Sequence, residues 1–378
     1  MSLACLLLLI TASGAAGGSF GRREGVPARL VDEAHSMAVL HVVFCSDVDT
    51  HLWQKRTRAI LDTWGARADK LVFVADVARR QDTFVRSHAR ALAHEEVLVP
   101  PRELYGHRTE QRLWALREAH RKWGGGAGAG GNARYAFFAF GNDNVYWVEE
   151  NLHAYLRTLV GAAGGPPPPL YIGHRLRDSG GIVFNSGAAF VLSAAALRLF
   201  VGQLDAGAGT GGEGGAAGAA GAAGGKAGCT TRGLPDDLML AECLREASPV
   251  PVLPLDTRDA RGGERFNAFG PIRTARGDVH DWYSAYSWYG LKKGAACCAR
   301  DVVAFHYVEA AEARALDALL HRAGPYERAD AMDAAQLARH WPSDWNEIGG
   351  YSAVPDTAKD AGADGVWELL VRKVAIVS

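Results

Sequence analysis

Three polar residues that directly follow an apolar run have side chains able to bind a metal ion. Asn142, Asp143 and Asn144 come after the segment YAFFAF at 135–140. Carboxylate and amide oxygens are ligands that hard divalent cations prefer. Ligands of open α/β sheets lie beyond the carboxyl ends of the strands, which is where these residues would be. A turn with helix-capping Asn and Asp explains the same residues equally well, so this segment leaves both interpretations open.

Two further segments carry side chains suited to proton transfer or metal binding. Asp236 and Asp237 precede the segment LMLAECL at 238–244, and a positioned carboxylate can accept the proton of an attacking hydroxyl as a general base. Acidic residues also stabilise the first turn of a helix, which is the alternative role for this pair. His306 lies in the apolar stretch VVAFHYV at 302–308, where an imidazole serves either as a metal ligand or as a core residue with a hydrogen-bond partner.

The elements that would position these residues alternate between strand and helix. Apolar runs rich in β-branched and aromatic residues predict buried strands at 39–44, 71–75, 97–99 and 135–140. Helical spacing of apolar residues predicts helices at 52–64, 84–93, 108–123 and 148–159. This alternation predicts an α/β fold with a mostly parallel, doubly wound sheet covered by helices on both faces.

The overall composition excludes two classes of protein. Lys and Arg number 41 against 42 Asp and Glu, giving a formal net charge of −1, so the chain has no overall basic field for non-specific nucleic-acid binding. A hydrophobic content of 48% excludes a wholly disordered chain. Two segments rich in Gly and Ala, 124–131 and 206–228, are predicted surface insertions, because neither has the Lys-Ser/Thr ending of a phosphate-binding loop.

The first 18 residues predict entry into the secretory pathway. The apolar run LACLLLLI at 3–10 is followed by small residues. It is shorter than the roughly 20 residues of a membrane span but suits a signal peptide or a short signal anchor. A buried N-terminal helix is the alternative.

In that compartment cysteines form disulfides, and five follow the leader. Cys229 and Cys243 flank a polar turn and could bridge it, whereas the adjacent Cys297 and Cys298 could bond each other or separate partners. Because five is an odd number, at least one of these cysteines either keeps a free thiol or forms a disulfide with another molecule.

Seven blocks, in matching order over residues 38–325, resemble the family 31 glycosyltransferases. Within that family they are most similar to the glycoprotein-N-acetylgalactosamine 3-β-galactosyltransferases, also called core 1 or T-synthase enzymes, and somewhat less to the Fringe enzymes. The final 53 or so residues, 326–378, match nothing and have no predicted role. The blocks are RAI with TWG (58–65), NDNVY (142–146), LYIGHR (170–175), NSGAAFVLS (185–193), PDD (235–237), DTRD with two Phe (256–269), and CC with FHYV (297–308).

The resemblance implies a GT-A fold for residues 38–325 and an inverting, UDP-sugar-dependent β-1,3-glycosyltransferase. The implied reaction moves galactose from UDP-galactose to the 3-hydroxyl of GalNAc-α-Ser/Thr on glycoproteins, with Mn²⁺ as cofactor. The implied location is the Golgi lumen, as a single-pass type II membrane protein or after cleavage of the signal, with a homodimer as a possible assembly. A glycoprotein or glycopeptide carrying O-GalNAc is then the partner, and no nucleic acid is expected.

The same resemblance carries the family's functional residues onto this chain. The catalytic base is Asp237, with Asp236 as the alternative, and the metal ligands are Asp143, Asn144 and His306. The positions implied for the nucleotide sugar are Arg58, Trp64, Asn142 and Asp143. The positions implied for the acceptor are Trp282, Tyr283, Tyr286 and Gly187, although packing in the core would explain any single ring of this aromatic segment.

The chain departs from the family at its acidic triplet, which reads Asn142-Asp143-Asn144. An Asn carbonyl can coordinate a hard cation but brings no negative charge, so metal binding is expected to weaken or fail. This departure keeps open a catalytically inactive, chaperone-like homologue that binds client proteins. A Fringe-like β-1,3-N-acetylglucosaminyltransferase is the other alternative.

Overall fold

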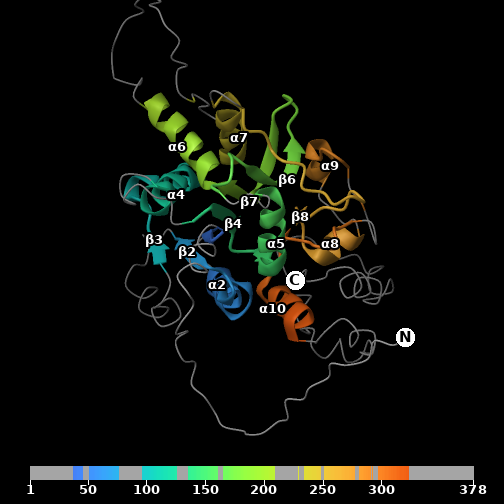
Figure 1. Ribbon diagram of the computed structural model, residues 1–378. Helices are drawn as coiled ribbons and strands as arrows, with labels where there is room; N and C mark the ends of the chain where they lie inside the picture. Colours follow the sequence, from blue (N-terminus) through green and yellow to red (C-terminus); the bar gives the residue numbers. More distant parts are fainter. Residues whose placement is uncertain are drawn as a thin grey trace, which may run out of the picture.

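A six-stranded sheet forms the centre of the molecule (Figure 1). The computed structural model describes residues 37–45, 51–75, 96–125, 135–160, 165–208, 229, 234–247, 251–276, 281–290, 292 and 297–322. The predicted helix at 84–93, the N-terminal segment 1–18, the C-terminal segment 326–378 and most of both Gly/Ala-rich insertions lie outside these residues. No helix in the described part of the chain is both long and apolar enough to cross a membrane.

The strand order of the central sheet is β3-β2-β1-β4-β7-β6. Strands β1 (Val39–Phe44), β2 (Lys70–Val74), β3 (Glu96–Leu98) and β4 (Phe137–Asn142) run parallel to one another. Strand β7 (Val183–Ser193) is antiparallel to both β4 and β6 (Tyr171–Arg177). The predicted α/β fold with a mostly parallel sheet is therefore confirmed for the described residues.

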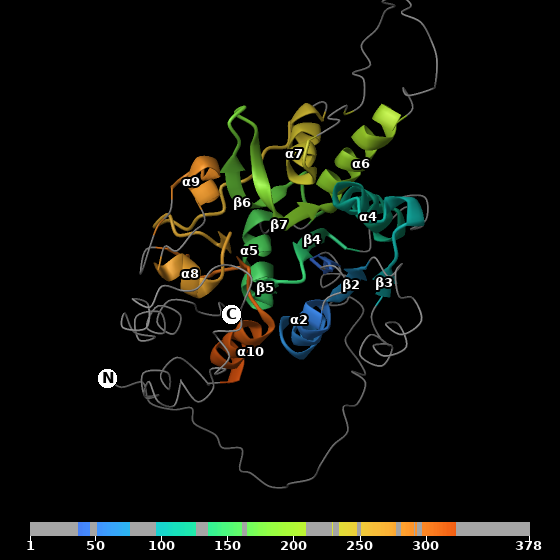
Figure 2. The ribbon, with the colours of Figure 1, turned by 180° about the vertical axis from the view of Figure 1, so that it is seen from behind.

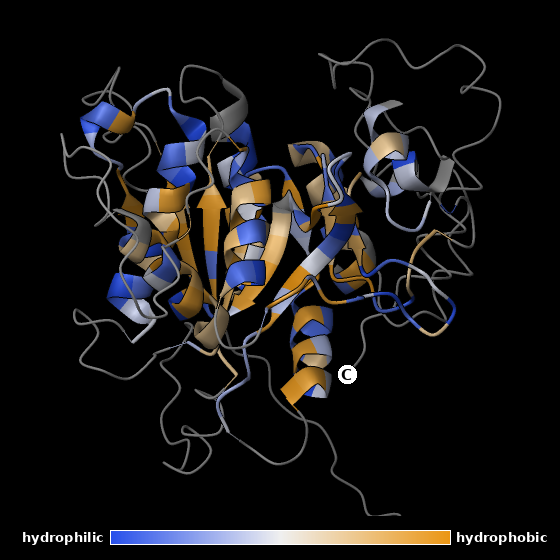
Figure 3. Ribbon diagram, turned by 90° about the horizontal axis from the view of Figure 1, so that it is seen from above, coloured by the Kyte–Doolittle hydropathy of each residue, from blue (hydrophilic) through white to orange (hydrophobic). Residues whose placement is uncertain are grey.

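Helices cover both faces of this sheet because its strands are apolar on both sides. In β1, Val39 and Val43 belong to one buried cluster, while Leu40, Val42 and Phe44 belong to the other. The first cluster includes residues of α2 (His51–Asp62), α5 (Glu149–Val160) and α10 (Ala310–Asp317). The second includes residues of α4 (Arg108–Trp123), α6 (Ala194–Ala208) and α7 (Asp236–Glu246). Figure 3 shows the predominantly hydrophobic strands between helices of mixed character.

A second, three-stranded sheet has the order β5-β9-β8. It consists of β5 (Val145–Trp147), β9 (Ala304–His306) and β8 (Phe266–Asn267). Val145 pairs with His306 across the antiparallel β5 and β9. Two short helices, α8 (Pro271–Arg276) and α9 (Asp281–Tyr286), follow β8 in the chain. They lie near each other at one side of the molecule, on the right in Figure 1 and on the left in Figure 2. This small sheet therefore brings the end of β4 beside the segment around His306.

The boundaries of β2, β3, β4, α2 and α5 differ from the predicted ones by one or two residues. Strand β4 extends two residues past its apolar run, because Gly141 and Asn142 continue the ladder with Val43 and Phe44 of β1. Helix α6 continues to Ala208, into the predicted insertion, since alanine is the strongest helix former.

Two disulfides are present in the described part of the chain. Cys229 is bonded to Cys243 of α7, and Cys297 is bonded to Cys298. The backbone N–H of Cys229 also donates to the carbonyl of Gln203 in α6. The disulfide and this hydrogen bond together fasten the start of the segment before α7 to two helices.

Gly263 packs closely against the backbone of Cys298, and a substitution can test this contact. A Cβ atom at this position would lie 2.6 Å from the backbone carbonyl carbon and oxygen of Cys298. Because backbone atoms cannot move aside as a flexible side chain can, Gly263→Ala is expected to lower the free energy of unfolding by about 1–3 kcal/mol. Urea denaturation measures this change.

Gly202 is the matched control. It lies within α6, and a Cβ there meets nothing within 4 Å. Gly202→Ala should therefore raise the free energy of unfolding by about 0.5–1 kcal/mol through helix propensity alone. Equal effects of the two substitutions would contradict the packing described for Gly263.

Candidate functional site

The polar residues after β4 lie beside two arginines that come from different helices. Arg112 of α4 donates to the Oδ1 atom of Asn142 and to the Oδ2 atom of Asp236, each over 2.7 Å. Its guanidinium also lies over the ring of Phe44, 5.2 Å from the ring centre. One side chain thus connects the carboxyl end of the central strands to the first turn of α7.

Arg56 of α2 holds the middle residue of the triplet. Its Nη1 atom lies 3.4 Å from the Oδ1 atom of Asp143, whose side chain is fully buried. It also donates from Nε and Nη2 to the carboxylate of Glu309, over 3.0 and 2.5 Å. The buried charge of Asp143 is therefore paired, as burial of a carboxylate requires.

Asn144 and His306 each carry a buried polar atom that has no hydrogen-bond partner among the described residues. These atoms are Oδ1 of Asn144 and Nε2 of His306. The two residues lie on neighbouring chain segments, because Val145 pairs with His306 and the N–H of Val308 donates to the carbonyl of Asn144. Ten other buried side-chain atoms of the described residues also lack a partner, but these two lie on neighbouring segments at the end of a sheet. Since buried polar atoms of proteins are generally hydrogen-bonded, this place is a candidate for a ligand.

His306 is held in its neutral form. Burial is the main cause that lowers its pKa to about 3, a hydrogen bond with the backbone of Ala268 opposes this shift, and the positive charges of Arg112 and Arg56 add to it. A neutral imidazole has a lone pair available for a cation, which protonation would remove.

Asp143, Asn144 and His306 fit a divalent cation in part. The amide oxygen of Asn144 and the imidazole nitrogen of His306 are available, but the carboxylate of Asp143 is engaged by Arg56. Within the described ranges, no group of three or more His, Cys, Asp and Glu could hold a metal ion. Protein residues there offer two neutral ligands, so a cation would need further oxygens from water or from a bound anion.

Asp236 and Asp237 are the first two residues of α7. Pro235 occupies the N-cap position, so neither aspartate is the capping residue, but both lie in the first turn, where negative charge favours the helix dipole as the alternative interpretation assumes. Asp236 is committed to Arg112, while the Oδ1 atom of Asp237 accepts from the adjacent N–H of Leu238 over 3.0 Å. The two adjacent carboxylates therefore differ in their surroundings, because Asp236 is paired with a positive charge and Asp237 accepts from a backbone N–H.

A series of neighbouring rings connects His306 to the molecular surface. Tyr307 stacks on His306, with 3.7 Å between ring centres, and Phe269 lies 5.8 Å from both Tyr307 and Trp282. Trp282 in turn lies 6.2 Å from Tyr286. Trp282 and Tyr286 are 39% and 37% exposed, so their faces are accessible to a ligand that stacks on aromatic rings.

Tyr283 differs from these neighbours because it is buried. Its hydroxyl donates to the Nε2 atom of His174 over 2.7 Å, and the Nδ1 atom of His174 lies 2.8 Å from the carbonyl of Phe266. For this ring, packing in the core is the better description. Gly187 lies within β7, in the middle of the strand that separates β4 from β6.

Two residues implied for the nucleotide sugar lie apart from the polar group after β4. Trp64 is 1% exposed, and its indole N–H donates to the carbonyl of Val145 over 3.1 Å, so it supports β5 from the core. The side chain of Arg58 is 65% exposed and pairs with Asp62 on the same helix. The structure brings neither of them to Asn142 or Asp143.

The sequence did not single out Arg56 or Arg112, nor the stacking of Tyr307 on His306. Arginines on exposed helix faces are common, so neither arginine carried a signal that could have singled it out. Tyr307 is the one residue other than glycine with a positive φ, 56°, in the described ranges. Strained backbone of this kind concentrates at functional sites, but only the FHYV block pointed to it beforehand.

His174 predicts a dependence of stability on pH. Burial lowers its pKa to about 4, below the ordinary 6.5. The unfolded chain therefore binds a proton more readily, so the contribution of His174 is complete above pH 6.5 and is lost as the pH falls to about 4. Compared with His174→Gln, the wild type should lose stability over this interval, as urea denaturation at several pH values would measure. Parallel pH profiles of the two proteins would contradict the buried, neutral state of this imidazole.

No family model matches this chain. The family resemblance therefore remains an expectation that rests on the sequence blocks. The α/β architecture and the polar site at the end of β4 rest on the geometry alone.

Proposed function

We propose that this chain is an inverting glycosyltransferase with a GT-A fold, which transfers galactose from UDP-galactose to the 3-hydroxyl of GalNAc-α-Ser/Thr in the Golgi lumen. The observation that carries the proposal is the pair of unpartnered buried atoms, Oδ1 of Asn144 and Nε2 of His306, at the carboxyl end of the sheet. The fold class, the position beyond the strand ends and the order of the sequence blocks all support it.

Asp237 is the proposed general base. As the acceptor 3-hydroxyl oxygen forms its bond with the anomeric carbon, the bond from that carbon to the diphosphate oxygen breaks, and the hydroxyl proton passes to the carboxylate. Asp236 is less suited to this step, because its carboxylate already accepts a charged hydrogen bond from Arg112.

The leaving diphosphate needs positive charge. Mn²⁺, held by Asn144 and His306, would neutralise part of this charge when bound. Arg112 and Arg56 are permanent positive charges close enough to His306 to contribute to its lowered pKa. Trp282 and Tyr286 are the proposed acceptor platform, since exposed aromatic faces stack on the apolar side of sugar rings.

A second candidate function follows from the amides of the triplet. Arg112 occupies the amide oxygen of Asn142, and Asn144 brings no negative charge. An inactive, chaperone-like homologue that binds client proteins would need no metal and could retain this arrangement.

Transfer from UDP-galactose to an α-GalNAc glycopeptide, assayed with and without Mn²⁺, separates these functions. Product formation that depends on Mn²⁺ is expected, and NMR of the disaccharide should show the β-linkage that inversion produces. Folded protein without turnover would exclude the enzyme, and product from UDP-GlcNAc alone would indicate the Fringe-like specificity instead.

A further inference from the structure

A small hollow lies beside Glu264. It has about 360 Å³ of space not filled by atoms, part of it open to solvent. The residues that line it include Phe269, Tyr283 and Tyr289, together with Glu264 and Lys292. The enclosed part has room for no more than a water molecule or two, so it suits a single small substituent of a ligand. None of the roles proposed above uses it.

The carboxylate of Glu264 has no hydrogen bond within the described part of the chain, although its side chain is only 15% exposed. The nearest basic nitrogen is Nδ1 of His174, which lies 3.7 Å from the Oε2 atom of Glu264. That nitrogen lies 2.8 Å from the carbonyl of Phe266, and the opposite nitrogen accepts from Tyr283. His174 therefore uses its one proton on Phe266 and has none for Glu264.

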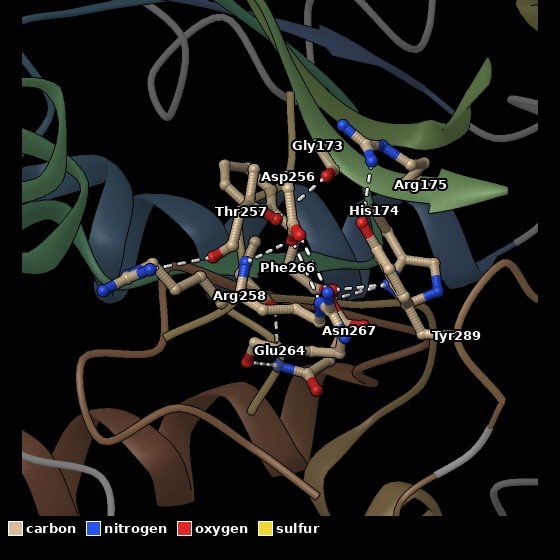
Figure 4. A network of polar contacts seen from close by, with 12 residues as sticks. Gly173, His174, Arg175, Asp256, Thr257, Arg258, Glu264, Phe266, Asn267 and Tyr289 are labelled. Atoms are coloured by element: carbon tan, nitrogen blue, oxygen red, sulfur yellow. Dashed lines mark hydrogen bonds and ion pairs between the residues drawn. The ribbon is translucent and has the colours of Figure 1, made fainter. Parts of the chain in front are cut away.

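The arginines around Glu264 are already committed to other partners (Figure 4). Arg258 pairs with Asp256 over 2.8 Å and lies over the ring of Tyr289. Arg175 donates to the hydroxyl of Tyr289 over 2.7 Å and to the carbonyl of Pro254. These contacts hold Tyr289 at the edge of the hollow without satisfying Glu264.

Lys292 supplies the complementary group on the wall. Its Nζ atom donates to the carbonyl of Arg261 over 3.1 Å. An ammonium group has three N–H donors, so two remain for another partner. The hollow thus offers a strong acceptor and a strong donor between apolar ring faces.

We propose that this hollow is a subsite for a neutral, hydroxyl-bearing substituent of the acceptor sugar, with Glu264 accepting a hydrogen bond from it and Lys292 donating one to it. A hydroxyl group both donates and accepts, so it can satisfy both residues at once. Phe269 connects the subsite to the surface, because its ring forms part of the wall and lies 5.8 Å from the ring of exposed Trp282. Burial raises the pKa of Glu264 to about 7, although the positive charges of Arg258, Lys292 and Arg175 oppose this rise.

This inference rests on the proposed function for its choice of sugar, so its test is equilibrium binding rather than turnover. The probe is methyl α-N-acetylgalactosaminide, added to the full chain without donor and followed by calorimetry or saturation-transfer NMR. Glu264→Leu should raise the Kd of the probe about tenfold or more, and Lys292→Met should raise it about threefold to tenfold, since charge-assisted hydrogen bonds are lost. UDP binding and thermal unfolding show whether each variant remains folded.

Lys122→Met is the matched control, because Lys122 pairs with Glu96 away from the hollow. It should leave the Kd of the probe unchanged. An unchanged Kd in Glu264→Leu, or no binding of the probe to the wild type, would overturn the subsite. Binding that depends on Glu264 in a chain that transfers no galactose would support the subsite and reject the proposed transferase.

Discussion

Replacement of Asp237 by Asn is expected to lower kcat for galactose transfer by about 10²–10⁴-fold, the usual contribution of a general base. The substitution keeps the size of the side chain and the hydrogen bond from the N–H of Leu238. It removes the carboxylate that accepts the proton of the acceptor hydroxyl. Steady-state kinetics with UDP-galactose and an α-GalNAc glycopeptide measure the effect, and calorimetry with UDP should show unchanged donor binding.

Asp236→Asn is the control for this experiment. Asp236 is adjacent to Asp237 in the sequence but pairs with Arg112. Loss of its negative charge should therefore affect donor binding and stability more than proton transfer. A large loss of kcat in Asp236→Asn together with normal kcat in Asp237→Asn would transfer the role of base to Asp236. Normal activity in both variants would reject the carboxylate pair altogether.

Restoring a carboxylate at Asn144 is expected to tighten Mn²⁺ binding by about tenfold or more, because charged oxygen ligands set the affinity of such sites. The Oδ1 atom of Asn144 is buried and has no partner among the described residues, so an oxygen already occupies the required position. Calorimetric titration of Asn144→Asp with MnCl₂ measures the change independently of turnover.

Two further variants show whether the added charge acts through the proposed site. In Asn142→Asp the new carboxylate would pair with Arg112, so a smaller gain in Mn²⁺ affinity is expected. In the double variant with His306→Ala, the gain from Asn144→Asp should largely disappear if both residues bind one ion. An identical Mn²⁺ affinity in wild type and Asn144→Asp would show that this position does not contact the metal.

The central strands and helix α4 could be predicted from the sequence because local patterns determine them. The apolar run 39–44 and the helical spacing over 108–123 match β1 and α4 residue for residue. The end of β4 could not be placed, because Gly141 and Asn142 are held by their pairing with β1 and not by their own propensities. Pairing between distant segments, such as β5 with β9, leaves no periodic signal in either segment.

The candidate site shows the same division between local and long-range information. The aspartates, amides and His306 could be singled out because their types are rare after or within apolar runs. The partners that decide their chemistry lie far away in the chain: Arg112 is 124 residues from Asp236, and Arg56 is 87 residues from Asp143. Trp64 could be singled out through the TWG block, but its burial against β5 could not be predicted, because it depends on a contact with Val145, 81 residues away.

The attachment of Cys229 to helices α6 and α7 has a practical consequence for engineering. The Gly/Ala-rich residues 209–228 run from the end of α6 to a cysteine that is bonded to α7, and these two helices pack against each other. Both ends of that segment are therefore anchored independently of its length, and doubling the length of a flexible connection between two fixed points costs in general only about 0.6 kcal/mol. A fluorescent reporter or an affinity tag inserted there would leave the anchoring points in place, so this position is the natural one for labelling the protein.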